Sequence, residues 1–81
     1  MHCTILLFAQ LAESIGSDRL TLQLPDGATI EHALNELASQ HEIIASMGDS
    51  LAVAIDDRYC ARDTTLCDGD TLALIPPVSG G

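Results

Sequence analysis

The apolar pattern of this chain constrains its fold more strongly than any other feature of the sequence. Residues 4–9 form a near-continuous apolar run of strand length, which predicts a central strand covered on both faces. The last predicted strand spans residues 71–75. Between these strands, only one segment has the spacing of a long helix, because Ile30, Leu34 and Leu37 fall on one face. One long helix combined with several strands favours an α+β fold.

Helix signals occur at two places. Residues 10–15 can form a short helix that stops at Gly16, since glycine readily adopts the left-handed conformation that ends helices. Thr29 is suited to cap the long helix, which we expect to continue as far as His41.

Strand signals complete the order of elements. Residues 20–24 and 51–55 alternate as half-buried strands do. Asp56-Asp57 then predicts a turn into a short further segment, residues 58–61. Asp26-Gly27 predicts a turn that allows the first two strands to form a hairpin. The order β-β-α-β-(β)-β fits a β-grasp fold, a mixed sheet with one main helix packed on one face. We expect this domain to span residues 1–75, followed by an extended tail over residues 76–81.

Strand parity predicts an exposed apolar face on this sheet. Side chains alternate between the two faces of a strand, and one helix can cover only one face. The residues expected under the helix are Ile5, Leu7, Leu72 and Leu74. The residues expected on the outer face are Leu6, Phe8, Ala73 and Ile75. An exposed apolar patch on a small domain is typical of a protein interface.

The tail has a composition suited to entering another protein's active site. Pro76-Pro77 restricts the backbone to an extended path, so it acts as a rigid spacer. Gly80-Gly81 has no side chains, which leaves its final carbonyl open to attack. The sequence therefore predicts chemistry at Gly81, with Gly80 providing steric access.

The charge of the chain indicates which partners it can bind. The net charge is -9, and all of its basic side chains except histidine are arginine. A phosphate backbone or an anionic membrane repels such a surface, so we expect neither nucleic acid nor a membrane as a partner. A basic protein surface is the natural complement.

The cysteines do not form a recognisable framework. Cys3, Cys60 and Cys67 are odd in number and include no C-x-x-C pair, so we expect reduced thiols and no metal site. The Asp68-Gly69-Asp70 segment lacks the other ligands of a calcium loop and predicts a turn. No targeting signal precedes the first strand, and we therefore expect a cytoplasmic protein.

Residues 66–81, LCDGDTLALIPPVSGG, resemble the C-terminus of the small subunits of molybdopterin synthase, a family of ubiquitin-like sulfur carriers. Members typically show L-x-D-G-D-x-[VL]-x-[FLI]-[IFL]-P-P-[VI]-[ST]-G-G. Residues 7–13, LFAQLAE, also match the family's strand-to-helix pattern, although Ala12 stands where many relatives carry arginine. The resemblance covers essentially the whole chain.

The resemblance implies a function and a set of partners. An activating adenylyltransferase would use ATP-Mg to adenylate Gly81, and a persulfide would convert it to a thiocarboxylate. The chain would then donate sulfur to cyclic pyranopterin monophosphate in the large subunit of molybdopterin synthase, within a heterotetramer of two small and two large subunits. The chain would bind no cofactor and would not be catalytic alone. The expected partner contacts are Phe8, Tyr59, Ile75, Pro76, Pro77, Val78 and Ser79.

Three other functions remain open at this point. The chain could carry sulfur for thiamine synthesis or tRNA thiolation, or it could be a protein modifier whose Gly81 forms isopeptide bonds with lysines. It could also be a binding module without tail chemistry. Activation of Gly81 is chemically the same for carriers and modifiers, so the sequence discriminates poorly between them.

Overall fold

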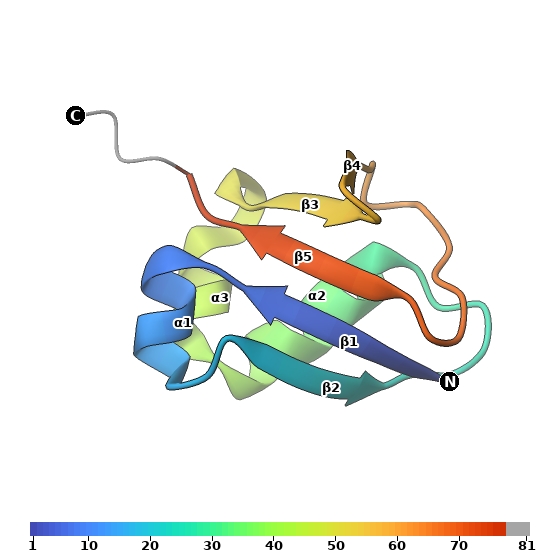
Figure 1. The fold of residues 1–81 in the computed structure, drawn as a ribbon, viewed down its shortest axis with the longest axis horizontal. Helices are drawn as coiled ribbons and strands as arrows, with labels where there is room; N and C mark the ends of the chain where they lie inside the picture. Colours follow the sequence, from blue (N-terminus) through green and yellow to red (C-terminus); the bar gives the residue numbers. More distant parts are fainter. Residues whose placement is uncertain (78–81) are drawn as a thin grey trace.

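A five-stranded mixed sheet forms the centre of the computed structural model, which describes residues 1–77. The strands follow the order β2-β1-β5-β3-β4, as Figure 1 shows. β1 and β5 are parallel neighbours at the centre, and every other neighbouring pair is antiparallel. This arrangement confirms the predicted α+β, β-grasp fold. The strands are β1 (His2–Leu7), β2 (Arg19–Gln23), β3 (Ala52–Ile55), β4 (Arg58–Tyr59) and β5 (Thr71–Ile75).

The helices leave one face of the sheet uncovered, so the expectation that the first strand is covered on both faces was wrong. In Figure 1, α2 and α3 lie behind the sheet and α1 lies where β1 ends, while the front of the sheet carries no helix. Within residues 1–77, no helix has the length and apolarity needed to span a bilayer. The helical segments are α1 (Ala9–Ile15), α2 (Ile30–Gln40), α3 (Glu42–Met47) and the 3-10 turn η1 (Gly48–Ser50).

The helix ends follow the predicted signals with one exception. The Thr29 hydroxyl accepts a hydrogen bond from the His32 backbone N–H at 3.3 Å, which caps α2. Gly16 ends α1 in the left-handed conformation with φ 85°, and its N–H donates to the Ala12 carbonyl. The expectation that the long helix reaches His41 was wrong, because His41 has an extended backbone and separates α2 from α3.

The core lies between the helices and the inner face of the sheet. Ile5, Leu72 and Leu74 are fully buried, and Leu7 is 2% exposed, so the predicted inner face is confirmed. The helices contribute the apolar side chains that pack against this face. They are Leu11, Ile30, Ala33, Leu34, Leu37 and Ile44.

The turns differ from the predictions in one connection. β1 and β2 pair as predicted, but α1 joins them, and the Asp26-Gly27 turn instead leads from β2 towards α2. The turn before β5 is confirmed. The Asp68 carboxylate accepts a hydrogen bond from the His2 N–H, and that of Asp70 accepts one from the Cys67 N–H, both at 2.8 Å. These aspartates therefore fix a turn against β1.

Arg62 contacts two other segments of the chain. Its Nη2 donates hydrogen bonds to the carbonyls of Gly48 and Leu51, both at 2.9 Å. Its Nη1 lies 3.9 Å from the Glu31 carboxylate and 3.8 Å from that of Asp49. One guanidinium thus ties the start of α2 to the turn that leads into β3.

Candidate functional site

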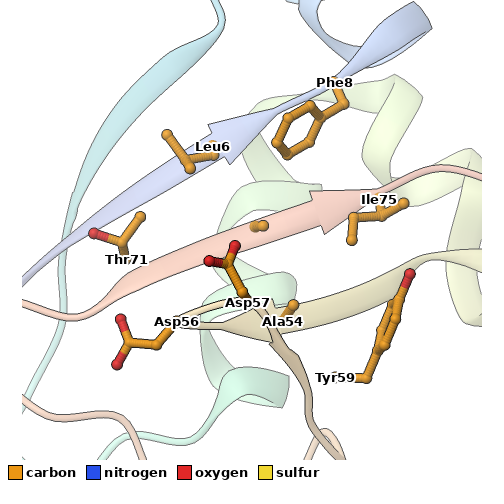
Figure 2. Close-up of a pocket in the computed structure, with 9 residues that line it drawn as sticks. Leu6, Phe8, Ala54, Asp56, Asp57, Tyr59, Thr71 and Ile75 are labelled. Atoms are coloured by element: carbon orange, nitrogen blue, oxygen red, sulfur yellow. The ribbon is translucent and has the colours of Figure 1, made fainter.

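The uncovered face of the sheet contains a shallow apolar hollow, shown in Figure 2. Its volume is about 630 Å³. The outward parity predicted for β1 and β5 is confirmed, because the predicted outer residues all line this hollow. The lining consists of Leu6, Phe8, Ala54, Asp56, Asp57, Tyr59, Thr71, Ala73 and Ile75.

Strand register explains why the face is hollow. Leu6 pairs with Ala73 across β1 and β5, Ala73 pairs with Ala54 across β3, and Ala54 pairs with Tyr59 across β4. This row therefore places two small side chains between two large ones. The alanines form a floor, and Leu6 and Tyr59 form opposite walls.

The largest exposed apolar side chains of residues 1–77 stand at this hollow. Phe8 is 46% exposed and Tyr59 is 74% exposed. Phe8 continues the extended path of β1. The chain then turns into α1 at Ala9, which has a positive φ of 50°. Exposed aromatic side chains around an apolar floor are typical of a protein-binding surface.

The apolar part of the outer face lies at the end from which the tail departs. Register places Thr4, Thr21 and Thr71 in one row at the opposite end of the face. Ile75 is half-buried at the end of β5, and the chain continues from it into Pro76. The hollow and the start of the tail are therefore adjacent.

The predicted tail residues fall into two groups. Pro77 is exposed, whereas Pro76 is buried, and both were predicted as partner contacts. The predictions for Val78, Ser79, Gly80 and Gly81 lie outside the described residues. The assignment of all these residues as a reactive tail or as partner contacts remains a prediction.

Part of the lining of the hollow was not predicted from the sequence. Ala54 joins the floor because β3 pairs with β5, and that pairing register is not readable from β3 alone. Asp56 and Asp57 were predicted only as a turn, yet both line the hollow. Thr71 was placed on the last strand without a role. The alternation of small residues in β3 was the signal for Ala54.

The chemistry of the hollow is that of a binding surface. Its lining has no histidine, cysteine or lysine, so it offers no base or thiol nucleophile beyond the two carboxylates at its rim. Within residues 1–77, no group of histidine, cysteine and acidic side chains could hold a metal ion. Burial, together with the nearby Asp70 and Asp68 carboxylates, raises the pKa of the Cys3 thiol, but Cys3 lies in the core.

Comparison with known proteins identifies relatives of the whole chain. A family model described as the ThiS family matches residues 5–81. The molybdopterin synthase sulfur carrier subunit of Arabidopsis thaliana is 34% identical over 77 residues, which cover 95% of this chain and 80% of that protein.

Solved structures agree with this fold. The crystal structure of small archaeal modifier protein 1 from Haloferax volcanii has a TM-score of 0.84 and 33% identity, and the match covers 95% of this chain and 98% of that chain. A chain in a complex of subunits 1 and 2 of the molybdopterin-converting factor from Helicobacter pylori has a TM-score of 0.69 and 24% identity, with all of both chains covered. The latter likeness concerns the fold.

Proposed function

This chain belongs to the ThiS family, and we propose that it is the sulfur-carrier subunit of a molybdopterin synthase. The similarity of 95% of this chain to a molybdopterin synthase sulfur carrier subunit supports this proposal. The observation that carries it further is the apolar hollow next to the departure point of the Pro-Pro-Val-Ser-Gly-Gly segment. A carrier needs both a surface that docks and a tail that reaches a distant site.

Loading is proposed to occur on an activating adenylyltransferase. The Gly81 carboxylate attacks the α-phosphate of ATP-Mg held by that enzyme, and pyrophosphate leaves. A persulfide sulfur then attacks the acyl carbon, and AMP leaves. A second thiol cleaves the sulfur–sulfur bond, which releases the thiocarboxylate and forms a disulfide. Adenylation matters because it replaces a poor leaving group with a good one.

Transfer is proposed to take place in the large subunit. The sulfur of the thiocarboxylate passes to cyclic pyranopterin monophosphate, and two loaded carriers supply the two sulfurs of the dithiolene. A heterotetramer of two small and two large subunits provides this arrangement. The Arabidopsis relative is one subunit of a molybdopterin synthase, which supports a second, large subunit as the partner of this chain.

This chain's own residues supply position and access. The tail over residues 77–81, when extended, spans roughly 16 Å at about 3.3 Å per residue, which is enough to reach a buried site. Gly80 and Gly81 leave the acyl carbon unobstructed because they have no side chains. The hollow docks the partner, while acid–base chemistry belongs to the partner enzymes. The negative charge of the chain supports a basic protein partner and disfavours nucleic acid and anionic membranes. We propose that this function is carried out in the cytoplasm.

A reconstituted sulfur transfer tests this function. The purified chain is incubated with its cognate large subunit, an activating enzyme, ATP, a sulfur source and cyclic pyranopterin monophosphate. We expect dithiolene product from the full chain and from Glu36→Gln, a control on the exposed side of α2. Deletion of Gly81 is expected to abolish product without changing the melting temperature. Full activity of the truncated chain would contradict the tail mechanism.

A second candidate function is protein modification. The specific observation that favours it is the 33% identity to small archaeal modifier protein 1. In this case the activated Gly81 forms an isopeptide bond with a lysine of a target protein. Mass addition to lysines of other proteins, under the loading conditions above, distinguishes this function from sulfur carriage.

A further inference from the structure

Two carboxylates line the apolar hollow, those of Asp56 and Asp57, and they are directed differently. Figure 2 shows the Asp57 side chain above β5, between Thr71 and Ala54, whereas the Asp56 side chain is directed away from Phe8 and Ile75. Both aspartates belong to the turn between β3 and β4. Asp57 therefore places a negative charge on the surface that the proposed function assigns to docking.

No cationic side chain within residues 1–77 neutralises the Asp57 carboxylate. None of the ion pairs within residues 1–77 involves Asp57. Arg62 is committed to Glu31 and Asp49. Arg58 is close in sequence, but it pairs with Ile55 in a register that directs it to the opposite face from Tyr59.

Docking removes water from this carboxylate. A charge that is taken out of water without a partner is strongly unfavourable, because no hydrogen bonds or opposite charge replace its hydration. A partner that covers the hollow with apolar side chains alone would bind less tightly, because the Asp57 carboxylate would lose its hydration without gaining a partner. A partner with a cation at this point instead gains a charge-assisted hydrogen bond in a dry environment.

We infer that the large subunit presents an arginine or lysine next to an apolar anchor side chain, and that this cation pairs with Asp57 when the anchor fills the hollow. The inference rests on the proposed function and specifies the chemistry by which the partner is recognised. The net charge of -9 gives the same sign of complementarity over the whole molecule. Asp57 adds a short-range requirement to that general attraction.

The backbone at Asp57 allows the charge to be removed cleanly. Its φ is 66°, in the left-handed region that asparagine and glycine adopt readily. Asp57→Asn therefore keeps the shape and the turn while removing the charge. Asp57→Gly also removes the charge and relieves the positive φ, so we expect it not to lower the melting temperature. Asp63→Asn is the matched control, since Asp63 is exposed and does not line the hollow.

The test measures association and dissociation rates with the purified cognate large subunit at two salt concentrations. We expect Asp57→Asn and Asp57→Gly to weaken affinity about 30-fold or more, mainly through faster dissociation, as loss of one member of a buried pair does. Asp63→Asn is expected to stay within about threefold of the unmodified chain, because exposed charges contribute little.

Two results overturn the inference while leaving the proposed function in place. One is tight binding by the unmodified chain with an Asp57→Asn affinity within about threefold of it. The other is an effect confined to the association rate that disappears at high salt, which indicates long-range attraction without a buried pair. Failure of the unmodified chain to bind the large subunit instead overturns the proposed function, and the inference with it.

Discussion

Leu6 and Ala73 are register partners on the two parallel central strands, and both side chains line the hollow on the face opposite the helices. Their sequence neighbours Ile5 and Leu72 are also partners, and both are fully buried. One pair of strands therefore contributes one set of residues to the core and the alternate set to the hollow that we propose as the docking surface. Substitutions on the inner face should therefore change stability, and substitutions on the outer face should change partner binding.

The proposed docking surface is tested by introducing a charge at Ile75, beside the start of the tail. We expect Ile75→Asp to weaken binding of the large subunit by about 10-fold or more, because an unpaired carboxylate becomes buried in the interface. Thr21→Asp is the control, since Thr21 is exposed on the edge strand β2 at the polar end of the same face. Equal binding by the Ile75→Asp and unmodified chains, in a calorimetric titration, places the interface elsewhere.

The inner face is tested by unfolding. Leu72 is fully buried, so we expect Leu72→Ala to lower the free energy of unfolding by about 2–5 kcal/mol. Leu6→Ala removes a side chain of the same size from the outer face and is expected to cost about 1 kcal/mol or less, since less apolar surface is buried there. Urea titrations followed by circular dichroism measure both values. Similar losses for the two variants would contradict the assignment of the faces.

Arg62 is predicted to stabilise the fold through its two carbonyl hydrogen bonds. Hydrogen bonds to charged groups contribute about 1.5–3 kcal/mol each, so Arg62→Met is expected to lower the free energy of unfolding by at least about 1.5 kcal/mol. Arg58→Met is the control, because Arg58 is exposed and takes part in none of the ion pairs of residues 1–77. A loss for Arg62→Met no larger than the control's would show that the guanidinium contributes little.

The cysteines are predicted to differ in reactivity. Cys67 is exposed, whereas Cys3 is buried and its thiol has a raised pKa, so a thiol reagent at neutral pH should label Cys67 and spare Cys3. Mass spectrometry of the labelled peptides measures this difference. Labelling of Cys3 in the folded chain at the rate of Cys67 is the contrary result.

The raised pKa of Cys3 also predicts a pH dependence of stability. Because the folded pKa exceeds the unfolded value of about 8.5, this contribution is fully present below about pH 8.5 and is lost as the pH rises through the folded pKa. The free energy of unfolding should therefore fall in alkaline solution. Cys3→Ala is expected to reduce that fall, and Cys67→Ala is expected to retain it.

Local signals in the sequence predicted most of the fold. Residues 71–75 were predicted as the last strand and form β5, and Thr29 and Gly16 act as the caps that their residue types indicate. α3 was not predicted, since six residues contain too few turns to show a helical period. The pairing of β1 with β2 was predicted, but the Asp26-Gly27 turn does not make the connection, because the short helix α1 joins these antiparallel strands.

The site was predicted only where it depends on single strands. Alternation along β1 and β5 placed Leu6, Phe8, Ala73 and Ile75 correctly on the outer face. The position of Asp57 over that face depends on the tertiary path of the turn between β3 and β4. No local pattern encodes such a path, so the carboxylate was visible in the sequence only as a turn residue.

The central claim is that Gly81 carries sulfur, and the intact mass of the chain tests it most directly. The purified chain is incubated with its activating enzyme, ATP and a sulfur source, and its mass is compared with that of a sample without ATP. We expect replacement of one oxygen by one sulfur at Gly81, only when ATP is present. The same enzyme preparation must load a known carrier protein as a control. If it does so and the mass of this chain stays unchanged, the proposed role of Gly81 is contradicted.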